Sequence, residues 1–239
     1  IKWRRWSVSK PRSHKAQNSL LEACDAVAHA ISKDDHRLSL AGVAIEPEGV
    51  VATDGHRLAF APLAPEVLAT AGGVFGQCTK SVSRIEQTAP GCFRRVRTPK
   101  GWRFGPALGE FPRWRTLLAL RAPKTTVRLH CAREVADSLR AVERIGEART
   151  PYVALVAGPD FKWEWTDPHV GSGSWGFPVE SIDGGPVHIG VNAHYLADAL
   201  RFASRGGRES VTVEIQDPLT VLVFRGDEGR LALVMPAQQ

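Results

Sequence analysis

Long apolar runs are missing from this chain, and so is the apolar segment of a secretory signal. No stretch approaches the roughly 18 apolar residues that a membrane-spanning helix requires. The first residues, Ile1–Trp6, are basic and aromatic. These absences argue against a membrane or secreted protein, so we expect a cytoplasmic protein with no membrane partner. The chain begins with Ile instead of Met, and we also expect that residues precede it.

Cysteine is scarce and scattered. The four cysteines, Cys24, Cys78, Cys92 and Cys131, form no CxxC pair and no Cys/His spacing that suits zinc. Cys24 and Cys131 fall in helical patterns, where a thiol usually behaves as a small buried apolar group. The sequence therefore predicts neither a metal site nor a cofactor.

The short motifs of common enzymes are also missing. The chain has no Gly-x-Ser-x-Gly elbow, no His-Glu-x-x-His pair and no glycine-rich phosphate loop. Asp54 and His56 form an acid–base candidate, because residues two apart in a strand share a face. Catalysis would still require a nucleophile, an orienting group and oxyanion donors. We therefore favour a non-enzymatic protein, with a hydrolase using Asp54 and His56 as the alternative.

The composition is that of a globular protein with a core. The 239 residues are 43% hydrophobic and 23% charged, enough for one large domain or two of about 120 residues. A net charge of +6 and an isoelectric point near 9.4 favour an anionic partner such as DNA. A basic solvated surface is the alternative, so the placement of the basic residues matters.

The first half of the chain predicts helices followed by strands. Apolar residues recur with a helical period from Leu20 to Ile31. Leu38–Ile45 and Val50–Phe60 predict one strand each. The second unit of this half is expected to contain a weakly patterned helix, Lys80–Gln87, and strands near Phe93–Arg97 and Trp102–Gly105.

The second half repeats this pattern more clearly. Ala132–Ile145 predicts a helix, and Asn192 caps another that runs to about Ser204. Gly171–Ser174 predicts a loop. The strands expected around these elements are Tyr152–Ala157, Phe161–Trp165, Val187–Val191, Val211–Ile215, Thr220–Phe224 and Leu231–Met235. The sequence thus predicts an α+β fold in which a helix-plus-antiparallel-sheet unit occurs about four times, two in each of the domains 1–122 and 123–239.

Two helices carry arginine on the side opposite their apolar stripe. Arg133, Asp137, Arg140 and Arg144 occupy offsets 0, 4, 7 and 11, and His194, Asp198, Arg201 and Arg205 repeat these offsets. Helices of this kind can contact phosphates without reading bases. A solvated helix face is the alternative. The residues expected to face double-stranded DNA are Arg133, Arg140, Arg144, Arg201 and Arg205.

Four segments together resemble the bacterial β sliding clamp, the processivity subunit of DNA polymerase III. They are the Thr-Asp-Gly-His-Arg-Leu run at residues 53–58, the stretch Phe111–Ala119, Asn192 with Tyr195, and the ending Val234–Pro236. The resemblance covers roughly residue 15 to the end and implies the second and third of the family's three domains. It departs from the family at Thr116, where an Arg is usual, and in the tail Ala237–Gln239.

The resemblance implies a groove that accepts short peptides from DNA polymerase, the clamp loader and repair proteins. Its apolar wall would be Leu40, Leu58, Pro112, Leu117, Leu219, Val221, Leu233, Met235 and Pro236. Its floor and polar edge would be Thr53, Gly55, His56, Arg57, Asn192 and Tyr195. A concave apolar patch with a few polar groups suits peptide anchors, and Met adapts to several partners.

The resemblance also implies self-association into a ring around DNA, in the cytoplasm and at the nucleoid. Clamp rings generally use six domains, so a complete chain of two domains would close as a head-to-tail homotrimer. Exposed strand edges would supply the pairing between subunits. The alternative is a clamp-derived interaction module that binds the same peptides without forming a ring.

Overall fold

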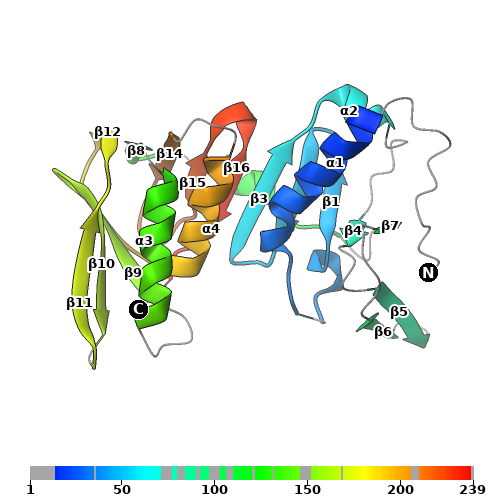
Figure 1. The fold of residues 1–239 in the computed structure, drawn as a ribbon, viewed down its shortest axis with the longest axis horizontal. Helices are drawn as coiled ribbons and strands as arrows, with labels where there is room; N and C mark the ends of the chain where they lie inside the picture. The colour runs from blue at the N-terminus through cyan, green and yellow to red at the C-terminus, as the bar shows by residue number, and fades with distance from the viewer. Residues whose placement is uncertain are drawn as a thin grey trace. The chain divides into compact units, whose positions relative to one another are not determined.

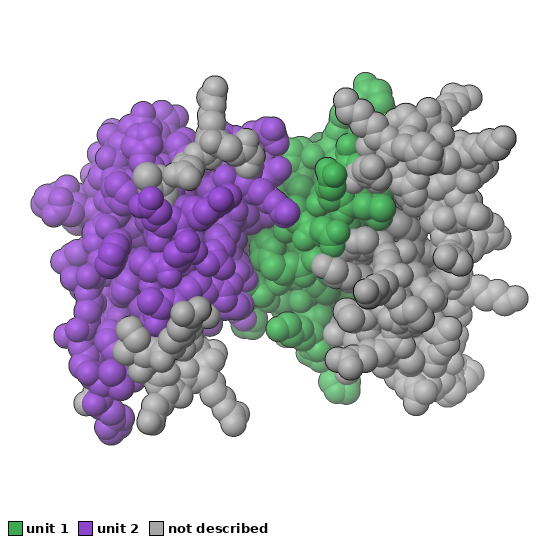
Figure 2. Space-filling model, in the orientation of Figure 1, with its two compact units in different colours: residues 1–113 green, residues 114–239 purple. Residues whose placement is uncertain are grey.

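The chain divides into two compact units, residues 1–113 and residues 114–239 (Figure 2). The computed structural model describes residues 14–34, 36–70, 77–79, 84–89, 92–96, 103–105, 110–119, 122–130, 132–145, 152–167, 169–205 and 210–237. The predicted boundary at 122/123 lies in the segment before the first strand of unit 2, which begins at Thr125.

Unit 1 is an antiparallel sheet with a helix on one face (Figure 1). Its strands run in the order β3-β2-β1-β4-β7. Helix α1, His14–Val27, packs on β2 and β3 through Leu20, Cys24 and Val27, which are all buried. This matches the predicted apolar stripe. The bounds of the other elements of unit 1 are β1 Val43–Glu46, β2 Gly49–Thr53, β3 Arg57–Pro62, α2 Pro65–Thr70, β4 Gln77–Thr79, β5 Arg84–Ala89, β6 Cys92–Val96 and β7 Arg103–Gly105.

Three predictions for unit 1 were wrong. Residues 50–60 are a hairpin of two strands and not a single strand, because the chain reverses after Thr53 and β3 pairs back on β2. Leu38–Leu40 is a 3₁₀ turn, held by the backbone N–H of Leu40 donating to the carbonyl of Arg37, and the strand begins only at Val43. The expected helix Lys80–Gln87 is also absent, because its described part belongs to β5, which pairs antiparallel with β6.

Unit 2 contains two long helices and two antiparallel sheets (Figure 1). One sheet has the order β11-β10-β9-β13, and the other has the order β12-β8-β14-β15-β16 within the unit. The bounds are β8 Thr125–Leu129, α3 Ala132–Ile145, β9 Tyr152–Ala157, β10 Phe161–Asp167, β11 Gly171–Gly176, β12 Val179–Gly184, β13 Val187–Asn192, α4 Ala193–Ala203, β14 Val211–Ile215, β15 Leu222–Arg225 and β16 Leu231–Val234. A 3₁₀ turn, Trp114–Leu117, precedes them.

Unit 2 is built from one strand–helix–strands repeat used twice. In the first copy β8 and α3 lead to β9, β10 and β11, and the chain then returns as β12 to pair with β8. In the second copy β13 and α4 lead to β14, β15 and β16, and the N–H of Ala237 then donates to the carbonyl of Gly190 in β13 at 2.8 Å. The copies interlock, because β8 pairs with β14 and β13 pairs with β9. The predicted use of two helix-plus-sheet units in this half is therefore confirmed.

One prediction for unit 2 was wrong. Gly171–Ser174, expected as a loop, belongs to β11, which pairs in continuous register with β10 from Gly171↔Asp167 to Gly176↔Lys162. Pairing with a neighbouring strand outweighs the low intrinsic strand preference of Gly and Ser.

The core of unit 2 lies between the helices and the sheets. Val135, Leu139 and Val142 of α3 are buried, as are Leu196 and Leu200 of α4. The indole N–H of Trp163 in β10 donates to the hydroxyl of Ser138 in α3 at 3.2 Å, which fixes the helix on its sheet. The two helices therefore turn their apolar stripes inward and leave their polar sides to meet each other and solvent. Among the described residues, no helix is long and apolar enough to cross a membrane.

Candidate functional sites

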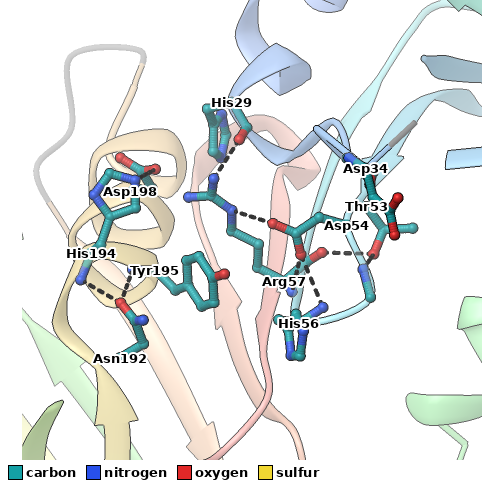
Figure 3. A network of polar contacts seen from close by, with 12 residues as sticks. His29, Asp34, Thr53, Asp54, His56, Arg57, Asn192, His194, Tyr195 and Asp198 are labelled. Atoms are coloured by element: carbon teal, nitrogen blue, oxygen red, sulfur yellow. Dashed lines mark hydrogen bonds and ion pairs between the residues drawn. The ribbon is translucent and has the colours of Figure 1, made fainter. Parts of the chain in front are cut away.

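The Thr-Asp-Gly-His-Arg run forms the turn of the β2–β3 hairpin (Figure 3). The carboxylate Oδ1 of Asp54 accepts the backbone N–H of His56 at 2.9 Å and that of Arg57 at 3.0 Å. The hydroxyl of Thr53 donates to the carbonyl of Arg57 at 2.7 Å and accepts the N–H of Gly55 at 3.1 Å. The short polar side chains that open the motif therefore satisfy the backbone of the turn.

Gly55 is the residue that the turn requires. Its φ is +94°, and it stands at the first central position of the two-residue loop, where type II′ hairpin turns place glycine. A Cβ at this position would lie 2.8 Å from Nη1 of Arg37, whose guanidinium donates to the carbonyl of Asp54 at 3.3 Å. Any other residue would meet both backbone strain and the Arg37 side chain.

Arg57 is buried, which is unusual for arginine. Its side chain is 8% exposed and forms an ion pair from Nε to Oδ2 of Asp54 at 3.1 Å, and its Nη2 donates to the carbonyl of His29 at 2.7 Å (Figure 3). His29 lies in the 3₁₀ turn that ends α1, so the guanidinium ties the hairpin to the helix. Arg57 therefore holds the β2–β3 hairpin against the end of α1 inside unit 1.

This geometry changes the chemistry expected of Asp54 and His56. The two residues lie in a turn and not on one face of a strand, so strand geometry does not bring their side chains together. Both carboxylate oxygens of Asp54 bind groups of the turn itself, with Oδ1 on backbone N–H and Oδ2 on Arg57. The carboxylate thus acts as the cap of a hairpin.

The groove candidates of unit 1 differ in exposure. Four of them are buried in the described structure, namely Leu40, Thr53, Arg57 and Leu58. Three are exposed, namely Gly55, His56 and Pro112. The exposed ones lie in the hairpin turn and in the segment before the end of the unit. The side chains of Thr53 and Arg57 make hydrogen bonds and an ion pair within unit 1.

Several groove candidates of unit 2 lie in or next to β16 and at the start of α4. Leu222 pairs with Val234, and continuing this antiparallel register places Val221 beside Met235. The hydrogen bond from Ala237 to Gly190 then brings the chain end alongside β13, which leads into Asn192. The exposed apolar side chains of this set are Leu117 at 38%, Leu219 at 70% and Met235 at 38%. The half-buried ones are Tyr195, Val221 and Pro236, and the buried ones are Leu233 and Asn192.

Asn192 begins α4 as the sequence predicts. Its φ and ψ are extended, and its side-chain oxygen accepts the backbone N–H of His194 at 2.9 Å and of Tyr195 at 3.3 Å (Figure 3). These are two of the helix donors that would otherwise lack a partner. Asn192 is 9% exposed, so its role in the described structure is to cap the helix.

Four of the arginines predicted to face DNA lie on α3 and α4, and Arg205 lies two residues beyond the end of α4. Two of the four form ion pairs with the other helix. The guanidinium of Arg140 in α3 forms an ion pair with Asp198 in α4. Arg201 in α4 pairs with Asp137 in α3, with 2.5 Å between Nη2 and Oδ1. Arg133 and Arg205 are exposed, and the side chain of Arg144 lies outside the described residues.

His194 completes the contact around Arg140. Nη1 of Arg140 lies 2.7 Å from Nδ1 of His194, and Nε2 of His194 lies 3.4 Å from Oδ2 of Asp198. A guanidinium only donates, so Nδ1 accepts and the imidazole proton belongs on Nε2, next to the carboxylate. The sequence singled out the arginines but missed the role of Asp137, Asp198 and His194. Their identical offsets in the two helices were the signal that could have revealed it.

Comparison with known structures defines the class of this fold. Two interlocked strand–helix–strands repeats, with paired helices over antiparallel sheets, form the sliding-clamp fold, which this chain adopts. No protein-family model matches the sequence, and no curated relative matches it either.

The particular proteins that the chain is similar to are β subunits of bacterial DNA polymerase III. The Pseudomonas aeruginosa subunit superposes with a TM-score of 0.70 at 20% identity, over 94% of this chain and 65% of that one. The Streptococcus pyogenes subunit gives 0.67 at 19% identity, over 92% and 64%. The Caulobacter crescentus clamp, solved with polyethylene glycol at a candidate β-motif tethering region, gives 0.66 at 22% identity, over 93% and 64%. The chain thus spans less than two thirds of the length of these structures.

Proposed function

We propose that this chain is a sliding-clamp scaffold that holds DNA polymerase and other partners on duplex DNA. The observation that carries the proposal is the likeness to β clamps along 92–94% of the chain, at TM-scores of 0.66–0.70 for the three structures above. The arginines of α3 and α4 support it, since helices can bind phosphates without base contacts. Such a scaffold acts by raising effective concentration and needs no catalytic residue.

The two halves of the chain would correspond to the middle and C-terminal domains of a β clamp. The proposed division near residue 122 keeps each domain with its own sheet and helices. If the protein consists of these two domains alone, three chains would make a six-domain ring, and we propose a head-to-tail homotrimer for that case, in the cytoplasm at the nucleoid.

Retention on DNA tests the proposal directly. The clamp loader is unidentified, so the probe is the chain alone, incubated with nicked circular plasmid or with the same plasmid linearised. A ring that encircles duplex stays on the circle after a challenge with 0.5 M salt, on the order of the concentration that screens direct phosphate contacts, and slides off the linear form. Equal loss from both forms, together with a monomeric mass, would instead support the interaction module without a ring.

The peptide groove is a second part of the proposal. Leu117, Leu219 and Met235 are exposed apolar side chains of unit 2. Polymerase and clamp-loader peptides would place their apolar anchors against this set. The Bartonella birtlesii clamp, a neighbour at 18% identity, was solved bound to griselimycin.

Met235→Asp tests the groove with a synthetic clamp-binding peptide. We expect affinity to fall by about tenfold or more, because a carboxylate would be desolvated beside the apolar anchor. Val170→Asp is the control, since Val170 is also exposed, at 47%, but lies before β11. Equal binding by wild type and Met235→Asp would reject the groove assignment.

A further inference from the structure

The polar faces of α3 and α4 meet in a reciprocal arrangement. Asp137 of α3 pairs with Arg201 of α4, and Arg140 of α3 pairs with Asp198 of α4. The residue numbers rise along one helix as they fall along the other, so the helices run antiparallel. Each helix thus gives one arginine and one aspartate to its partner. We call these four residues the interhelical layer.

The interhelical layer divides the arginines into two groups. Arg140 and Arg201 lie within it, each with a carboxylate from the other helix. Continuing the antiparallel register places Arg133 at the N-terminal end of α3, beyond the layer, and Arg205 follows the C-terminal end of α4 on the same side of the helix pair. Both of these side chains are exposed. The face therefore combines a nearly neutral centre with a cationic end.

Accessibility within the layer is uneven. The side chains of Arg201 and Asp137 are 41% and 61% exposed, so an ion in solvent can reach this pair. The side chains of Arg140 and Asp198 are 24% and 12% exposed, and His194 adds a third contact to that pair. Asp137 is thus the carboxylate that is more readily displaced, and Asp198 is held more firmly.

We infer that Asp137 and Asp198 compete with DNA phosphates for Arg201 and Arg140, and thereby set how weakly this face holds duplex DNA. The inference rests on the proposed function, in which this face meets DNA. Carboxylate and phosphate oxygens bind the guanidinium fork in the same way, so one excludes the other. An arginine paired with a carboxylate neutralises no phosphate and releases no counterion. A scaffold that must slide gains from contacts that exchange readily.

The test measures binding of the chain to a short DNA duplex by fluorescence anisotropy at several salt concentrations. Asp137→Asn frees Arg201 for phosphate without changing the size of the side chain. We expect affinity to rise about two- to fivefold, the range of an exposed ion pair. The slope of log affinity against log salt should steepen by about 0.9, as for one additional phosphate contact.

Asp160→Asn is the matched control, because it makes the same change of net charge in the exposed β9–β10 turn. We expect this variant to leave the salt slope unchanged. The increase in affinity caused by Asp137→Asn must also vanish when Arg201→Ala is added, because the freed Arg201 guanidinium is what binds the additional phosphate. Asp198→Asn provides a second variant of the same kind, acting through Arg140, and thermal unfolding verifies that each variant is folded.

The outcomes separate the inference from the proposed function. If the duplex binds, but Asp137→Asn and Asp198→Asn behave like Asp160→Asn, the competition is absent and the DNA-facing assignment survives. The competition is equally ruled out if the gain from Asp137→Asn persists without Arg201. If neither wild type nor any variant binds duplex, the DNA-facing assignment fails and the inference fails with it.

Discussion

Arg57 is the residue through which the turn motif acts on unit 1. Its guanidinium binds Asp54 within the hairpin and the carbonyl of His29 at the end of α1. A buried charge is tolerable only when its partners are in place, and removing one partner leaves the other uncompensated. The motif that suggested acid–base chemistry therefore serves the packing of a hairpin against a helix.

Arg57→Met tests this role, since Met keeps the aliphatic stem and removes the charge. We expect unit 1 to lose about 3 kcal/mol of unfolding free energy, because Asp54 loses its counter-charge and the His29 carbonyl loses its donor. Urea denaturation followed by tryptophan fluorescence measures the change. The control is Arg113→Met, whose ion pair with Glu110 is also three residues apart but joins side chains that are 83% and 77% exposed.

The control should lose less than about 0.5 kcal/mol, as exposed ion pairs usually do. Equal losses for Arg57→Met and Arg113→Met would mean that burial of the Arg57 guanidinium contributes nothing. The hairpin would then be held by its backbone pairing alone.

The carboxyl of Glu164 offers a second test on a single residue. Nζ of Lys162 lies 2.6 Å from Oε1 of Glu164, and this hydrogen bond is the main cause that lowers the pKa of the carboxyl. Desolvation opposes it, and the charges of Lys162 and His188 lower the pKa further by smaller amounts. A carboxyl with a lowered pKa in the folded state stabilises the fold above its unfolded-state pKa. That contribution is lost as the pH falls through the folded-state value.

Lys162→Met should therefore return the pKa of Glu164 toward its ordinary value and reduce the acid dependence of stability. NMR titration of the Glu164 carboxyl carbon measures the shift. His188→Gln should change the pKa of Glu164 less, because the charge of His188 lowers that pKa less than Lys162 does. A pKa that is unmoved by Lys162→Met would contradict the assignment.

Among the elements, the helices with a clear amphipathic stripe were the most predictable from the sequence. The bounds of α3 were expected at Ala132–Ile145, and the structure has them there. Val135, Leu139 and Val142 recur with the helical period and are all buried, so the pattern reports the packing directly. A helix with one amphipathic face can be predicted from its local sequence alone, without knowing its contacts with distant residues.

The elements that the sequence missed depend on partners elsewhere in the chain. The apolar residues on both sides of Asp54 suggested one long strand, although the Asp-Gly pair is a hairpin signal in its own right. Burial of Arg57 could not be predicted, because its acceptor, the carbonyl of His29, is 28 residues away. Strand β11 was missed because its Gly and Ser residues become a strand only through pairing with β10.

Asn192 stabilises α4 by capping its N-terminus. Asn192→Ala should cost about 1 kcal/mol, because two backbone donors of α4 lose their acceptor. Chemical denaturation of unit 2 measures the loss. Asn192→Asp keeps an acceptor and adds a negative charge near the helix N-terminus, so it should retain most of the stability. If Asn192→Asp were as damaging as Asn192→Ala, a contact of the amide nitrogen would matter more than the cap.

The duplication within unit 2 explains why the polar residues repeat in α3 and α4. Each copy contributes one helix, and the interlocked sheets bring the two helices together in antiparallel order. Because the two helices are antiparallel, an Asp of one copy lies beside an Arg of the other copy, and the reverse. The reciprocal ion pairs of the interhelical layer are the consequence. The identical offsets in the sequence pointed to them, but the pairing itself follows from the interlocking of the two copies.

Self-association is the property of the whole chain that the proposed ring requires, and β11 is the edge that suits it. Within the described residues β11 pairs with β10 alone, all six of its residues are exposed, and Trp175 is 55% exposed. An edge strand without charge is a template for pairing with another chain. In a head-to-tail ring each interface joins two different surfaces of the chain. The β11 edge would be one of these two surfaces.

Trp175→Glu should therefore weaken assembly, since a buried aromatic residue often dominates an interface and a charge on an edge strand opposes pairing. We expect the dissociation constant, measured by sedimentation velocity, to rise about thirtyfold, the equivalent of about 2 kcal/mol. Met235→Asp supplies the crossed control: it should impair peptide binding and leave assembly intact, whereas Trp175→Glu should do the reverse. A wild-type chain that stays monomeric at high micromolar concentration, or assembly that is indifferent to Trp175→Glu, would show that β11 is not the subunit edge.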